Sequence, residues 1–164
     1  MQPAEPQRRL PKMLAIVTAL LLAARLLAPD PKSLVVWVPL EAAARAAEQS
    51  KKPILYNFAA DWCSPCKKLD RTVFARADMA KLINERFVPV KVMDREREEG
   101  KNPPSVQELQ DRHKVSAFPT LVVARADGSQ VAQTVGSSGG ASGIRSFLNR
   151  SLREAERLRP AAGP

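Results

Sequence analysis

The chain has few of the residues that bind metals or read nucleic acids. Its 164 residues include two cysteines, one histidine and one tyrosine. A structural zinc site takes about four ligands, so one copy of the chain cannot complete a Cys/His site of that kind. Lys and Arg outnumber Asp and Glu by 26 to 17, but no basic stripe with interleaved aromatic residues is present. We therefore expect no bound metal and no nucleic-acid partner.

The excess of positive charge is concentrated at the two ends of the chain. Residues 1–32 hold five basic and two acidic residues, and residues 145–164 hold the same numbers. The much longer stretch between them holds sixteen basic and thirteen acidic residues. Charge placed in this way favours attraction of the ends to an anionic membrane surface.

Residues 1–32 have the pattern of a targeting segment. Arg8, Arg9 and Lys12 precede a continuous apolar run from Met13 to Ala24. A run of this length suits a signal peptide better than the ~20 residues of a full span. No small-x-small cleavage site follows it, so an uncleaved anchor is an equal alternative, and a helix of a cytosolic protein is a third. Positive charge on the N-terminal flank places the N-terminus in the cytoplasm and the rest of the chain outside.

Both cysteines lie in the motif Cys63-Ser64-Pro65-Cys66, which follows an apolar, strand-like run. If a helix begins near Cys63, then Cys66 lies one turn further on the same face. Unpaired N–H groups at a helix N-terminus stabilise a thiolate and lower its pKa from about 8.5 to roughly 3.5–7.5. The spacing therefore predicts that Cys63 attacks a substrate disulfide and that Cys66 resolves the mixed disulfide.

A purely structural disulfide is the alternative interpretation of this pair. Its two-residue gap would close a very short loop and constrain the unfolded chain little. The position of the motif directly after a strand favours a redox-active pair.

The hydrophobic pattern predicts an α/β fold in which a mixed sheet has helices on both faces. Parallel pairing is expected across helical crossovers, and Asp127-Gly128 predicts an antiparallel hairpin. The expected strands are 34–38, 54–59, 88–93, 120–125 and 129–135. The expected helices are 39–49, 63–74, 79–87, 105–113 and 144–158, with loops at 94–104 and 136–143.

The chain resembles the thioredoxin superfamily in two motifs, Ala60-Asp61-Trp62-Cys63-Ser64-Pro65-Cys66-Lys67 and Phe118-Pro119-Thr120. Within the superfamily it is most similar to membrane-anchored or periplasmic thioredoxin-like domains, including the C-terminal domain of the transmembrane thiol reductant conductors. The resemblance implies a thioredoxin fold over residues 33–158, between the N-terminal segment 1–32 and a disordered tail, 159–164.

The resemblance also implies how a substrate is bound. Pro119 would follow a cis peptide bond and face the dithiol. Phe118 would offer its backbone to an extended substrate segment, and Trp62 would cover the dithiol with an apolar surface. No cofactor is expected apart from the Cys63–Cys66 disulfide itself.

One residue departs from the family pattern. Thioredoxins carry a buried aspartate six residues before the first cysteine, and this chain has Asn57 there. A buried carboxylate can shuttle the proton of the resolving thiol, whereas an amide cannot. The single histidine, His113, lacks partners for catalysis and is expected to have a structural or surface role.

The CxxC motif and the N-terminal segment predict a thiol–disulfide oxidoreductase of the bacterial cell envelope, and the resemblance implies that it reduces protein disulfides. Its expected partners are protein disulfide or dithiol substrates, an upstream electron-donor thiol protein and, through the N-terminal segment, the inner membrane. A disulfide oxidase or isomerase on the same scaffold is an alternative. A non-catalytic binding or assembly module is another.

Overall fold

The structure, a computed structural model, describes residues 33–158. The predicted targeting segment, 1–32, and the predicted disordered tail, 159–164, lie outside the described residues. None of the helices within 33–158 is long and apolar enough to cross a membrane.

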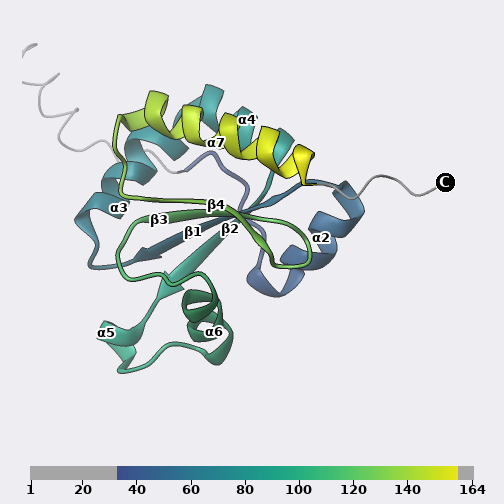
Figure 1. Cartoon of the computed structure of the whole chain (residues 1–164). Coiled ribbons are helices and arrows are strands. Elements are labelled where there is room, and N and C mark those ends of the chain that lie inside the picture. The colour runs from purple at the N-terminus through teal and green to yellow at the C-terminus, as the bar shows by residue number, and fades with distance from the viewer. Residues whose placement is uncertain (1–32, 159–164) are drawn as a thin grey trace, which may run out of the picture. The chain divides into compact units, whose positions relative to one another are not determined.

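A four-stranded mixed sheet in the order β2-β1-β3-β4 forms the centre of the described part (Figure 1). Strand β1 (Ile54–Ala60) pairs in parallel with β2 (Val88–Asp94). It pairs antiparallel with β3 (Thr120–Ala124), which in turn pairs antiparallel with β4 (Gln130–Val135). The predicted mixed sheet and the predicted hairpin are therefore confirmed.

Helices cover both faces of the sheet, as predicted (Figure 1). One face carries α3 (Ser64–Leu69), the π-helical turn η2 (Asp70–Phe74), α4 (Ala77–Arg86) and α7 (Gly140–Arg157). The other face carries the short turn η1 (Leu40–Ala42), α2 (Ala43–Ser50) and α6 (Pro104–Arg112). A short helix, α5 (Glu96–Glu99), lies between β2 and α6.

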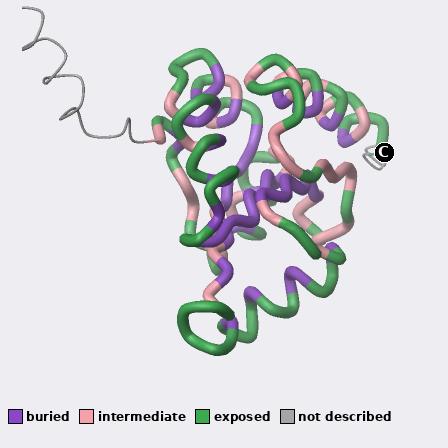
Figure 2. The backbone as a smooth tube through the Cα atoms, turned by 90° about the vertical axis from the view of Figure 1, so that its left-hand side faces the viewer, coloured by how far each residue is buried: buried purple, intermediate pink, exposed green. Residues whose placement is uncertain are grey.

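The alternation of side chains along β1 divides the interior into two cores. Leu55 packs with the α3, α4 and α7 layer, whereas Tyr56 and Phe58 pack with the α2 and α6 layer. Every residue of β1 is buried, and Figure 2 shows the buried residues concentrated along the central strands. This burial on both faces explains why the β1 sequence is an almost continuous apolar run.

The predicted strand at 34–38 is wrong. The N–H of Leu34 donates to the Phe74 carbonyl, and that of Val36 donates to the Asn84 side chain. Only Val38 reaches the sheet, where its N–H donates to the carbonyl of Pro89. Because Leu34 and Val36 donate to groups of the helical layer and Val35 donates to the Ser33 hydroxyl, the segment runs along the domain without extending the sheet.

Two predicted loops are partly helical. Within 94–104 the chain forms α5, which ends at Gly100 in a left-handed conformation, φ 74°. Within 136–143 the chain already enters α7 at Gly140, four residues before the predicted start. The predicted helix 63–74 is a regular α-helix only to Leu69 and then widens into η2.

Candidate functional site

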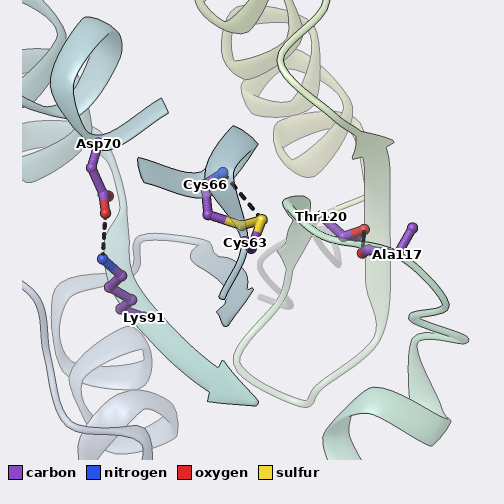
Figure 3. Close-up of a disulfide and its surroundings, with 6 residues drawn as sticks. All are labelled: Cys63, Cys66, Asp70, Lys91, Ala117 and Thr120. Carbon is purple, nitrogen blue, oxygen red and sulfur yellow. Dashed lines mark hydrogen bonds and ion pairs between the residues drawn. A yellow bond between two sulfur atoms is a disulfide. The ribbon is translucent and has the colours of Figure 1, made fainter. Parts of the chain in front are cut away.

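The two cysteines lie where β1 leads into α3. Cys63 is the N-cap of α3 and is joined to Cys66 by a disulfide, with 5.3 Å between their Cα atoms (Figure 3). The Cys63 Sγ also accepts a hydrogen bond from the Cys66 backbone N–H at 3.1 Å. Pro65 fits in the first turn because that turn needs no N–H donor at this position. The Cys63 sulfur thus lies at the positive end of a helix, as the motif predicts.

Both cysteines are covered in this disulfide form. Cys63 is 2% exposed and Cys66 is 4% exposed. They pack with Ala59 and Ala60, and Phe118 from the opposite loop lies against the same cluster. The Cys63 residue, which the motif predicts to attack a substrate disulfide, is therefore shielded by its neighbours in this form.

Trp62 and Phe118 form an aromatic pair beside the dithiol. Their ring centroids are 5.9 Å apart at an interplanar angle of 71°, an edge-to-face arrangement. Trp62 remains 46% exposed, and the Arg97 guanidinium lies over its ring at 5.5 Å. The pair thus presents a large apolar surface to solvent next to the cysteines.

The loop before β3 is held on both sides. The Phe118–Pro119 peptide bond is cis. The Thr120 hydroxyl donates to the Ala117 carbonyl at 2.7 Å (Figure 3), and the Pro119 carbonyl accepts from the Gly136 N–H at 2.7 Å. Within residues 33–158, the N–H and the carbonyl of Phe118 have no hydrogen-bond partner, so both are free to pair with an extended peptide.

Asn57 occupies a buried position on the α3 side of β1. It lies between Leu55, which packs against the α3 layer, and Ala59, which packs against the two cysteines. It is 2% exposed and its Oδ1 atom has no hydrogen-bond partner. The amide therefore stands in the strand that supports the dithiol, with one polar atom unsatisfied.

An ion pair lies next to Asn57. Lys91 is its neighbour in the β2 register, and the Lys91 Nζ contacts the Asp70 carboxylate at 2.7 Å (Figure 3). Asp70 follows Cys66 by one helical turn, and its N–H donates to the Cys66 carbonyl. Sequence reasoning missed this pair because Asp70 and Lys91 carry no motif and meet only through the fold.

Sequence reasoning also missed a polar network at the end of β2. Asp94 is 5% exposed and accepts hydrogen bonds from the side-chain amides of Asn102, at 2.7 Å, and Gln110, at 2.9 Å. The Asn102 side chain in turn accepts from the Arg95 N–H. The charged run 94–104 suggested only a solvated loop, and no pattern within it indicates that Asp94 is buried.

His113 lies away from the cysteines in the other core. Its Nδ1 is 2.9 Å from the Gln130 Oε1, and its ring packs against Tyr56 and Phe58. Burial lowers the pKa of His113 and Arg112 lowers it further, while the hydrogen bond to Gln130 opposes this change. This position agrees with the structural role expected for it. No group of three His, Cys, Asp or Glu residues within the described part could hold a metal ion.

Comparison with known proteins identifies the family. A family model described as a thioredoxin-like domain matches residues 40–148. The chain belongs to the thioredoxin-like family. A thioredoxin of Echinococcus granulosus is 31% identical over 106 residues, which are 65% of this chain and 84% of that protein.

Solved structures of thioredoxin-like proteins have the same fold. The structure described as a DsbH oxidoreductase is 25% identical, with a TM-score of 0.63 over 80% of this chain and 91% of that one. A thioredoxin from Thermus thermophilus has a TM-score of 0.61 at 22% identity, covering 74% of this chain and 89% of that one. With its CxxC pair at the N-terminus of α3, this thioredoxin-like chain is a thiol–disulfide oxidoreductase.

Proposed function

We propose that the protein reduces disulfides in proteins of the bacterial cell envelope. The observation that carries the proposal is the Cys63 Sγ at the N-cap of α3, where it accepts the Cys66 N–H. In the reduced protein the Cys63 thiolate attacks a substrate disulfide, and one substrate thiolate leaves. Cys66 then attacks the Cys63 sulfur of the mixed disulfide and releases the second substrate thiol. Two electrons pass to the substrate, and the Cys63–Cys66 disulfide forms.

The surroundings of the dithiol support the direction of electron flow. Within residues 33–158 the Cys63 Sγ accepts one hydrogen bond, and the pocket beside Trp62 and Phe118 is lined by three carboxylates, those of Asp94, Glu96 and Asp111, against one guanidinium, that of Arg97. Negative charge nearby disfavours a thiolate. A strongly oxidising protein of this fold needs a stabilised reduced form, and nearby carboxylates destabilise the thiolate of that form.

The cell-envelope location is supported by the N-terminal pattern. Three basic residues followed by an apolar run, Met13 to Ala24, are typical of a segment that directs the following domain across the inner membrane. The substrates would then be cysteine-containing proteins of the envelope, and an upstream thiol protein would return the dithiol to its reduced state.

Insulin disulfide reduction by the purified full-length chain tests the proposal. We expect the wild type to reduce insulin and Cys63→Ser to lose the activity. Cys66→Ser should retain the first attack and accumulate a mixed disulfide. Ser146→Ala, on the exposed face of α7, is the matched control. Reduction by Cys63→Ser at the wild-type rate would refute the assignment of the nucleophile.

The reduction potential separates the reductase from the oxidase or isomerase. A value near the about −270 mV of thioredoxins supports the reductase, whereas a value near the about −120 mV of a strong disulfide donor supports the alternative. The potential is measured by equilibration with defined ratios of reduced and oxidised dithiothreitol or glutathione.

A further inference from the structure

A pocket of about 770 Å³ lies beside the dithiol. One wall is the Trp62–Phe118 aromatic pair, and the opposite walls come from the start of α5 and from α6. Phe118 belongs both to this pocket and to the cluster around Cys63 and Cys66. A polypeptide whose disulfide reaches the cysteines would therefore pass the mouth of this pocket.

The charged groups that line the pocket are mainly acidic. Asp94, Glu96 and Asp111 supply three carboxylates, and Arg97 supplies the one guanidinium in the lining. The described residues as a whole carry more basic than acidic side chains. The pocket thus has the opposite charge to the rest of the domain.

These three carboxylates lack cationic partners. The ion pairs formed within residues 33–158 include none of Asp94, Glu96 and Asp111. The neighbouring acids outside the pocket differ, because Asp61 and Glu99 both pair with Arg95. Within residues 33–158, the three carboxylates that line the pocket therefore form no ion pair, although a basic side chain satisfies some of their acidic neighbours.

Asp94 is fixed in place at the pocket wall. Two side-chain amides, from Asn102 and Gln110, donate to the same oxygen, Oδ2. The backbone N–H of Glu96 donates weakly to the other oxygen at 3.3 Å. Amide donors orient this buried carboxylate without neutralising it, so it retains its attraction for a cation.

We propose that this pocket binds a lysine or arginine side chain that lies next to the disulfide in the substrate polypeptide. The inference rests on the proposed function, because it concerns the substrate of the same dithiol. The long apolar stem of such a side chain packs on Trp62 and Phe118, and its charged end reaches the carboxylates. Arg97 already places a guanidinium over the Trp62 ring, so that ring face accepts this group. Preference for basic sequences beside the reacting disulfide follows from this arrangement.

Three disulfide-linked peptides test the proposal. They are identical except for one residue beside the cysteine, which is Arg, Gln or Glu. The reduced full-length protein attacks each peptide in a single turnover, so the measurement does not depend on the upstream donor. We expect the second-order rate constant to follow Arg > Gln > Glu, with about a tenfold difference between Arg and Glu, and to converge in high salt.

The double variant Glu96→Gln/Asp111→Asn removes two of the charges and leaves the buried Asp94 network in place. We expect its Arg-to-Glu rate ratio to fall towards one. The matched control, Glu48→Gln/Glu85→Gln, removes the same charge from exposed residues that line a different pocket. It should keep the wild-type ratio.

The outcomes separate this inference from the proposed function. Equal attack on all three peptides by the wild type would overturn the pocket proposal and leave the dithiol chemistry intact. An unchanged preference in Glu96→Gln/Asp111→Asn, or an equal loss in the control variant, would also overturn it. Failure to attack any peptide would instead refute the proposed function.

Discussion

Asn57 is the residue at which this chain departs most clearly from the chemistry of its family. Its side chain is buried beside the strand residues that support the dithiol, and its Oδ1 has no partner. An amide there cannot accept the proton of Cys66 when that thiol attacks the mixed disulfide. We therefore expect resolution of the mixed disulfide to be slower here than with a buried carboxylate at this position.

Replacing Asn57 with Asp should accelerate resolution. A buried carboxylate has a raised pKa and can act as a general base near neutral pH. Such bases contribute about 10²–10⁴-fold, and we expect a gain at or below the lower end of this range. Single-turnover release of the second thiol from a preformed mixed disulfide at pH 7 measures the effect.

Asn57→Leu is the matched control for that variant. It removes the unsatisfied oxygen at similar volume and supplies no base, so resolution should not become faster. Its free energy of unfolding should rise or stay unchanged, whereas that of Asn57→Asp should fall because a charge is buried. Equal resolution rates in Asn57→Asp and the wild type would contradict the role assigned to this position.

At the scale of elements, the first turn of α7 depends on Gly143. A Cβ at this residue would stand 2.2 Å from the Ser138 carbonyl oxygen, which is closer than atoms can approach. The absence of a side chain thus lets the preceding loop close over the helix start. This close approach allows α7 to begin at Gly140, inside the glycine- and serine-rich stretch.

Gly143→Ala should destabilise the protein. Relieving the overlap requires the backbone around Ser138 to move, and forced repacking of this kind costs about 1–3 kcal/mol. Urea denaturation should show a lower midpoint with an unchanged slope. Ser146→Ala, one turn further along α7 and exposed, should leave the midpoint nearly unchanged. Equal midpoints for both variants would show that the loop adapts without cost.

The elements that the sequence predicts well are those with a strong local pattern. The apolar run of β1, the Asp127-Gly128 turn and the apolar face of α7 are each encoded within a few consecutive residues. The segment 34–38 is also rich in β-branched residues, but the N–H groups of Leu34, Val36 and Val38 donate to groups distant in the sequence. No local pattern encodes such partners.

The same distinction applies to the site. The CxxC motif and the Phe118-Pro119 pair are each contiguous in the sequence, and the structure brings Phe118 into the cluster around the two cysteines. The Lys91–Asp70 pair and the unpaired acids of the pocket join residues from separate elements. They become visible only when the register of β1 and β2 and the position of α6 are known.

For the molecule as a whole, His113 links folding to pH. Burial against Tyr56 and Phe58 lowers the pKa of its imidazole in the folded protein. The unfolded chain therefore binds a proton more readily than the folded one below the ordinary His pKa of about 6.5. The free energy of unfolding should be constant just above that pH and should fall as the pH drops below it.

Urea denaturation at several pH values between about 5 and 7.5 measures this effect. His113→Gln cannot titrate, so its free energy of unfolding should vary less over this interval. Asp78 and Asp127 also have lowered pKa values, caused mainly by hydrogen bonds from Arg76 and Ser129 respectively. Carboxylates titrate at lower pH, so these two residues do not account for a change in the free energy of unfolding over this interval. The same slope in His113→Gln and the wild type would exclude His113 as the source.

Phe118 covers the Cys63–Cys66 disulfide, and this covering affects which thiols can reduce it. A small thiol diffusing in solution meets almost no sulfur surface, so it should react slowly with the oxidised protein. We expect a protein donor that binds at the cis-proline loop to move Phe118 aside and so reach the disulfide. The dithiol would then exchange only slowly with small thiols in solution. The fraction of the protein that is reduced would be set by the partner proteins that dock on it.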